Sequence, residues 1–139
     1  MILGIDHVGL ATDDSEGAGT FMVALGMEKA AQGVAPAYGV ACEFWKYPGR
    51  TDEIAIEIVS PIRENCAITG RLGRSGPGLY HIAFILDNIE GELERLRKKG
   101  FSPVDSQPCQ GARKGMRVAF MYVPKPAALL IELVQHEPS

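Results

Sequence analysis

The sequence contains little of what marks several large classes of protein. Its only cysteines are Cys42, Cys66 and Cys109, an odd number without a C-x-x-C spacing, which argues against a disulfide framework and against a structural zinc site. The 14 basic residues against 17 acidic ones leave a net charge of −3 and no long basic block, so we do not expect a nucleic-acid or membrane-surface protein. No apolar run approaches the roughly 18 residues of a membrane span, and the first residues lack the basic start of a signal peptide. These absences favour a cytoplasmic, globular protein.

What the sequence does contain is an internal repeat. The segments that begin at His7 and at His81 carry His, Asp, Glu and Gly at identical offsets, and a further glycine stands 19 residues after each histidine. Two later pairs of segments also correspond: 39–44 with 115–120, and 56–59 with 131–134. Three matches in the same order along the chain indicate a duplicated module.

Each copy of the module is predicted to form a strand, a helix and three further strands. Apolar runs bounded by Gly or Asp predict the first strand of each copy, at 2–11 and at 78–86. Asp13 and Asp87 are natural N-caps for the helices that follow. The later strands are expected at about 27–33, 37–46 and 53–60, and at about 101–105, 115–123 and 127–135.

The predicted fold class is therefore α+β. A single domain, 1–139, would consist of the modules 1–60 and 78–139 and of a connector, 61–77, with room for one short helix. Four strands cannot close a sheet alone, so the paired βαβββ modules would form one curved, eight-stranded mixed sheet with the helices outside. Its concave face would be a cleft into which equivalent strand positions of both modules point together.

Those equivalent positions hold two histidines and two glutamates, His7, Glu57, His81 and Glu132. Neutral imidazole nitrogens and carboxylate oxygens suit a divalent ion such as Zn, Fe, Co, Ni or Mn. Four ligands on one side would leave a position open for substrate, which is typical of a catalytic site. Each residue alone has an ordinary structural explanation, a buried strand histidine or a glutamate that faces water, but four matched positions favour a metal site. His136 has no counterpart in the repeat and is expected to be exposed.

Several segments together carry a resemblance to a known family. They are Ile5-Asp6-His7-Val8-Gly9, Glu57-Ile58-Val59-Ser60-Pro61, Gly78-Leu79-Tyr80-His81-Ile82-Ala83-Phe84, Gly115-Met116-Arg117-Val118-Ala119-Phe120 and Leu130-Ile131-Glu132-Leu133. With them, nearly the whole chain resembles the vicinal oxygen chelate (glyoxalase/bleomycin resistance/extradiol dioxygenase) superfamily, and within it most closely the methylmalonyl-CoA epimerases. The resemblance implies a glyoxalase-like fold, a homodimer, and one divalent metal ion (Co, Ni, Zn, Mn or Fe) held at the positions of His7, Glu57, His81 and Glu132.

The resemblance also implies a reaction, the movement of a proton alpha to a thioester carbonyl through a metal-stabilised enolate, with an acyl-CoA or another thioester as substrate. Such an epimerisation needs an acid or base on each face of the carbon. Glu132 would serve one face while also binding the metal. The family pattern places the second acid at Cys42, whereas the nearest acid here is Glu43. Because strand side chains alternate, either a bulge turns Glu43 into the cleft or the protein lacks this second acid. The same alternation predicts that Tyr80 points away from the metal.

Two alternative functions remain open on the sequence. A glyoxalase I-like lactoylglutathione lyase, acting on a thiol hemithioacetal, would use the same ligands. It would also need a cationic clamp for the carboxylates of the thiol, with candidates at Arg63, Arg71, Arg74, Arg113 and Arg117. A non-catalytic small-molecule-binding or resistance protein of the same fold is the other alternative. The intact set of four metal-ligand positions counts against such a binder.

Overall fold

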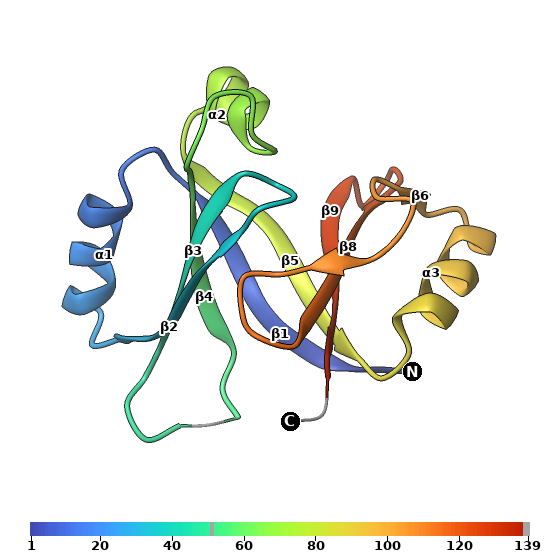
Figure 1. Ribbon diagram of the computed structural model, residues 1–139, viewed down its shortest axis with the longest axis horizontal. Helices are drawn as coiled ribbons and strands as arrows, with labels where there is room; N and C mark the ends of the chain where they lie inside the picture. Colours follow the sequence, from blue (N-terminus) through green and yellow to red (C-terminus); the bar gives the residue numbers. More distant parts are fainter. Residues whose placement is uncertain (51, 138–139) are drawn as a thin grey trace.

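Strands and helices follow one another along the chain in nearly the predicted order (Figure 1). The computed structural model describes residues 1–50 and 52–137. The elements are β1 (Ile2–Ala11), α1 (Ser15–Ala24), β2 (Glu28–Ala35), β3 (Val40–Lys46), β4 (Ala55–Pro61), α2 (Thr69–Ser75), β5 (Gly78–Leu86), α3 (Ile89–Lys98), β6 (Ser102–Pro103), β7 (Cys109–Gln110), β8 (Met116–Val123) and β9 (Leu129–His136). The predicted α+β class is confirmed, and a short helix, α2, lies in the predicted connector.

The nine strands of the described residues belong to one curved sheet, in the order β2-β3-β4-β1-β5-β9-β8-β6, with β7 paired to β8. The two central strands, β1 and β5, run antiparallel, and each pairs in parallel with the last strand of its own half, β4 or β9. The sheet has nine strands where eight were predicted, because the expected strand 101–105 is reduced to β6 and a second two-residue strand, β7, follows it. Pro103 lies in β6 and Pro108 precedes β7, and proline cannot donate a ladder hydrogen bond.

The helices α1 and α3 begin one residue later than the sequence predicts. Asp14 caps α1 and Asn88 caps α3, and their side chains accept hydrogen bonds from backbone N–H groups three residues on, at 2.9 and 3.1 Å. The predicted caps Asp13 and Asp87 were therefore wrong. An N-cap must combine a non-helical backbone with a side-chain oxygen that reaches the third amide of the helix, and in the structure the next residue meets both conditions. The carboxylate of Asp87 instead binds the N-terminal amine at 2.7 Å.

The helices α1 and α3 lie on the outer side of the curved sheet, whereas α2 lies at one end of it and packs Leu72 against residues of the concave side (Figure 1). On the outer side, Met22 of α1 packs in one cluster with Trp45 and Ile58, and Ile89 and Leu96 of α3 pack in another with residues of β8 and β9. A third cluster, which includes Cys42, Val59 and Met116, lies on the concave side. The strands β4, β8 and β9 thus bury side chains on both faces of the sheet, one face towards a helix and the other in the concavity.

Among the described residues, no helix has the length and apolar character that a membrane crossing would need.

Candidate functional site

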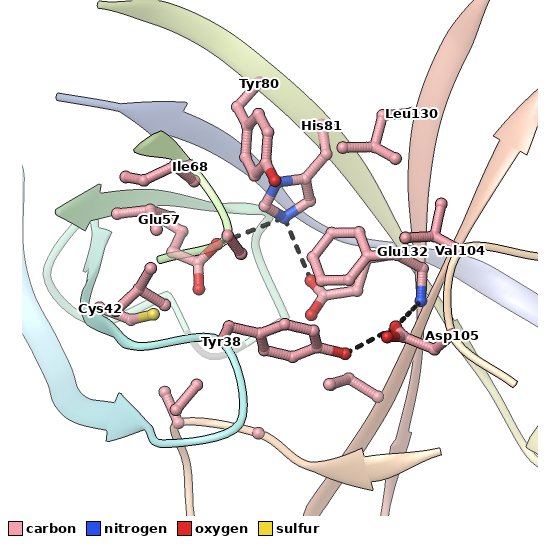
Figure 2. Close-up of a pocket in the computed structure, with 18 of the residues that line it drawn as sticks. Tyr38, Cys42, Glu57, Ile68, Tyr80, His81, Val104, Asp105, Leu130 and Glu132 are labelled. Carbon is pink, nitrogen blue, oxygen red and sulfur yellow. Dashed lines mark hydrogen bonds and ion pairs between the residues drawn. The ribbon is translucent and has the colours of Figure 1, made fainter. Parts of the chain in front are cut away.

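The concave side of the sheet encloses a cavity of about 250 Å³ (Figure 2). Most of its lining is apolar, and none of the lining residues is Lys or Arg. The lining residues that carry polar or ionisable side chains are Tyr38, Cys42, Glu57, Tyr80, His81, Asp105 and Glu132. A cavity with apolar walls and a few convergent polar groups is the usual form of a small-molecule site.

The two central strands supply two imidazoles that point at the same place. His7 lies on β1 and His81 on β5, and their Nε2 atoms are 3.2 Å apart. In the antiparallel ladder, His7 is opposite Ala83 and His81 is opposite Gly9. Gly9 leaves the room that the His81 ring occupies, because a Cβ atom at this position would lie 2.2 Å from His81 Cε1. The glycine two residues after the first histidine therefore belongs to the site.

The two neighbouring strands, β4 and β9, add a glutamate each. Glu57 Oε1 lies 3.2 Å from His7 Nε2 and 3.3 Å from His81 Nε2, and Glu132 Oε1 lies 2.9 and 3.1 Å from the same two atoms. All four side chains are buried, and their ligand atoms lie within 4.8 Å of one another. The structure thus brings together the four residues that the repeat singled out.

The charges in this cluster are strongly coupled. Burial alone would lower the pKa of His7, but its hydrogen bond to Asp6 and its ion pairs with Glu132 and Glu57 outweigh burial and raise the pKa to about 11. Burial also opposes the charged form of His81, and Glu132 and Glu57 again raise its pKa. In the opposite sense, burial favours the neutral form of both glutamates, but the two histidines hold their pKa values below the usual range. The two buried glutamates are negatively charged, and positive charge between them is needed to balance them. In the absence of an ion, the protonated histidines supply it.

The donor set fits a divalent cation. Glu57 Oε1 is buried and makes no hydrogen bond within the described part of the chain, although buried polar atoms are normally hydrogen-bonded. Two imidazole nitrogens and two carboxylate oxygens converge from four strands, and this mixture suits Zn, Fe, Co, Ni or Mn. The four side chains could therefore hold one such ion, which would replace the protons as the balancing charge.

We expect cation binding to release protons and to strengthen with pH. The pKa of His7 lies at about 11, above its ordinary 6.5, so the ring is protonated near neutral pH, whereas a metal binds the neutral nitrogen. Without metal, the raised pKa stabilises the fold fully below about pH 6.5, and this contribution is lost as pH rises through about 11. Calorimetry of Co²⁺ binding in two buffers with different ionisation enthalpies measures the released protons. Equal heats in both buffers would contradict the expectation.

Asp6 holds the outer nitrogen of His7. Its Oδ2 lies 2.7 Å from His7 Nδ1 and accepts a hydrogen bond from Arg113 at 2.6 Å. Arg113 also stacks over the ring of Phe44, 4.1 Å from its centroid. His136 is exposed, as predicted, and its Nε2 approaches Asp6 Oδ1 at 3.2 Å. Sequence patterns did not reveal Asp6 as a site residue, although an acid directly before a buried strand histidine is the signal that could have found it.

Replacement of Asp6 by asparagine is expected to weaken metal binding about 10–100-fold, the usual loss when a carboxylate that orients a metal-binding histidine is removed. The fold should be retained, because asparagine has the same shape. Asp13→Asn is the matched control, because Asp13 is exposed and lies outside the site. Competition with a chromogenic chelator gives both affinities. Equal affinity of Asp6→Asn and Asp13→Asn would show that Asp6 does not orient His7.

Cys42, and not Glu43, faces the cavity. On β3, Cys42 lines the cavity opposite Val59, while Glu43 lies on the outer face, where it accepts a hydrogen bond from Trp45 Nε1 at 3.2 Å and pairs with Lys29 at 3.3 Å. The pairing of β3 with β4 is regular, and the irregularity in its pairing with β2 lies at residues 29–31 of β2. The bulge that would turn Glu43 inward is absent from these pairings, so the structure does not bring Glu43 to the site.

Tyr80 lines the cavity, contrary to the prediction that it points away. Along the central ladder, Gly9 is opposite His81 and the next residue, Leu10, is opposite Leu79, so Tyr80 is an extra residue in a bulge of β5. The bulge lets two successive side chains face the same side, and the Tyr80 ring packs edge-on against the His81 ring at 5.1 Å (Figure 2). Burial, followed by the charge of Glu132, raises the pKa of Tyr80 to about 12, which keeps the hydroxyl protonated.

Known proteins with similar sequences and structures bear directly on this site. A family model described as the Glyoxalase/Bleomycin resistance protein/Dioxygenase superfamily matches residues 6–120. The uncharacterized protein YqjC of Bacillus subtilis is 26% identical over 132 residues, which cover 94% of this chain and 91% of that protein. The mitochondrial methylmalonyl-CoA epimerase of Mus musculus is 29% identical over 133 residues, 94% of this chain and 72% of that protein. A variant of the Streptomyces coelicolor methylmalonyl-CoA epimerase, in complex with 2-nitronate-propionyl-CoA, superposes with a TM-score of 0.88 at 27% identity, over 99% of this chain and 100% of that one.

Proposed function

The chain belongs to the glyoxalase/bleomycin resistance protein/dioxygenase superfamily, and we propose that it is a metal-dependent epimerase that moves a proton alpha to the carbonyl of an acyl-CoA thioester. The observation that carries the proposal is the buried cluster of His7, Glu57, His81 and Glu132 in an otherwise largely apolar cavity. The similarity to methylmalonyl-CoA epimerases over nearly the whole chain supports a dicarboxylic acyl group such as methylmalonyl.

In this proposal the four side chains are the metal ligands. A divalent cation held there would attract two substrate oxygens and make the hydrogen on the carbon between them more acidic. Glu132 turns Oε1 towards both histidines, which leaves Oε2 to accept that proton. The apolar walls exclude water, and burial by itself opposes the charge on this carboxylate and so favours its taking up the proton.

Because Glu43 lies outside the cavity, a second candidate is an isomerase that uses a single base on one face of the substrate carbon. A glyoxalase I-like lyase, which moves a proton between neighbouring carbons, fits this description. None of the predicted arginine candidates lines the cavity, however, and two of them pair with acids elsewhere, Arg113 with Asp6 and Arg117 with Glu90. Without a cationic clamp there, we rank a glutathione substrate below a CoA thioester.

Proton NMR of the cobalt-loaded protein with methylmalonyl-CoA in deuterated water tests the proposal. We expect loss of the C2 proton that depends on metal and stops after treatment with EDTA. Addition of an enantioselective mutase to the reaction would show whether the exchanged product has also inverted. Exchange with inversion supports the epimerase, and exchange with retention indicates a one-base enzyme. If no exchange exceeds the EDTA control, neither a two-base nor a one-base enzyme acts on methylmalonyl-CoA. A hemithioacetal substrate would then be assayed next.

Glu43→Gln is expected to leave the exchange rate within about twofold of the unaltered protein, because Glu43 lies outside the cavity. The lost ion pair with Lys29 is partly exposed and contributes at most about 1 kcal/mol to the free energy of unfolding. Exchange rates and urea unfolding curves of the two proteins check both numbers. A large drop in rate with unchanged stability would mean that Glu43 reaches the substrate after all.

A further inference from the structure

Among the polar side chains of the cavity that the proposed chemistry does not use, Tyr38 and Asp105 are joined by a hydrogen bond. Tyr38, in the turn between β2 and β3, donates its hydroxyl hydrogen to Asp105 Oδ2 at 2.7 Å. Asp105, in the loop between β6 and β7, also accepts a hydrogen bond from the backbone N–H of Phe120 at 2.8 Å. Both residues line the same cavity as Glu132 (Figure 2). They are half-buried, whereas Glu132 is only 5% exposed, so they lie nearer the mouth of the cavity.

This pair offers a ligand hydrogen-bond acceptors only. Both hydrogen bonds that the Asp105 side chain accepts end on Oδ2, and Oδ1 has no hydrogen-bond partner among the described residues. The Tyr38 hydroxyl is fixed as a donor to Asp105, and it accepts a hydrogen bond from Cys109 Sγ at 3.2 Å. Burial, followed by the neighbouring Cys109 and Asp105, raises the pKa of Tyr38 far above its usual range, which keeps the hydroxyl protonated. A carboxylate against apolar walls is stabilised by any donor that a ligand brings.

We propose that Tyr38 and Asp105 form a second anchoring point of the substrate, at which Asp105 accepts a hydrogen bond from the amide N–H of the thiol arm of a thioester. This inference rests on the proposed function. With the acyl group at the deep cluster, the thiol arm must leave through the mouth, past these two residues. In a CoA thioester the first polar group after the sulfur is an amide N–H, two methylene groups away. The mouth would therefore select pantetheine-type thioesters over thioesters that lack this donor.

A purely structural role for the pair makes a different prediction. The hydrogen bond joins residues 38 and 105, which come from opposite halves of the chain, and it could simply hold the rim of the cavity together. Loss of such a clasp would slow every substrate by the same factor. Loss of an anchoring point would slow only a substrate that carries the donor. The comparison of two substrates that differ in a single group separates these roles.

The test uses two methylmalonyl thioesters, one of N-acetylcysteamine and one of O-acetyl-2-mercaptoethanol, in which an ester oxygen replaces the amide N–H. For the metal-loaded protein we expect kcat/KM of C2-proton exchange to be about tenfold or more higher for the amide, mainly through KM. In Asp105→Ala the two values should become equal. Tyr38→Phe, which keeps the ring against Phe120, should lower the preference, and Tyr47→Phe, whose hydroxyl binds Leu25 O outside the cavity, should not.

Each outcome of this test either supports or overturns the anchoring point. Equal rates on both thioesters in the unaltered protein, a result that needs no variant to fold, would overturn the anchoring point while the proposed function stands. A preference that survives in Asp105→Ala, or equal slowing of both substrates, would leave only the clasp. If neither thioester nor methylmalonyl-CoA exchanged its C2 proton, the proposed function would fail and the inference with it. Loss of preference in both Asp105→Ala and Tyr38→Phe, but not in Tyr47→Phe, would support it.

Discussion

Glu132→Gln is expected to reduce metal-dependent exchange of the C2 proton about 10²–10⁴-fold, the usual contribution of a general base. The glutamine has the same shape and fills the same space, so β9 and its neighbours should keep their positions. It cannot accept a proton at this position, and it removes one of the two negative charges that the protonated histidines, or a cation in place of their protons, otherwise balance. The histidines should lose part of their raised pKa as well, since Glu132 is the leading source of the increase for His81.

Glu57→Gln is the matched comparison for this prediction. Glu57 Oε1 also lies near both histidines, 3.2 Å from His7 Nε2 and 3.3 Å from His81 Nε2, and glutamine has the same shape as glutamate. We expect Glu57→Gln to need more metal for half-maximal activity and to exchange at a rate near normal once saturated. Glu132→Gln should stay slow at any metal concentration. Equal behaviour of the two variants at saturation would mean that Glu132 is a ligand only.

The centre of the site could be read from the sequence because strand geometry is periodic. Once the repeat placed His7, Glu57, His81 and Glu132 at equivalent positions on four strands, alternation alone sent them to one face, and the structure brings them within 4.8 Å. The long strands β1 and β5 also matched their predicted bounds, since each is a mostly apolar run that Gly or Asp delimits.

The surroundings of the centre could not be read in the same way, because they depend on irregularities and long-range contacts. Tyr80 faces the cavity through a bulge that no pattern in β5 announces. Arg113 reaches Asp6 across 107 residues of sequence, and Asp105 reaches Tyr38 across 67, through loops whose course composition does not determine. Periodicity identifies the residues that regular strand geometry positions, whereas these contacts depend on a bulge and on loops.

Gly9→Ala is expected to remove metal binding almost as completely as His81→Ala. Gly9 sits opposite His81 in the central ladder, and a Cβ atom there would lie 2.2 Å from Cε1, 2.4 Å from Nδ1 and 2.9 Å from Nε2 of the ring. Such distances leave no room for both groups, so the imidazole must swing out and one of the four ligands is lost. The affinity for Co²⁺ should fall by at least the 10–100-fold that follows from merely disorienting a ligand. The rearranged packing should cost about 1–3 kcal/mol of unfolding free energy.

A double-mutant cycle shows whether this cost comes from the collision with His81. In a His81→Ala background the ring is gone, and alanine suits a strand at least as well as glycine, so adding Gly9→Ala should cost almost nothing in stability. Gly73→Ala is the control for a glycine with open space, since a Cβ there meets nothing within 4 Å. An equal loss of stability from Gly9→Ala in both backgrounds would mean that Gly9 serves the backbone of β1. If Gly9→Ala lowers stability only in the protein that keeps His81, Gly9 provides the space that the His81 ring occupies. The metal-binding position of a histidine in the second module then depends on a residue of the first module.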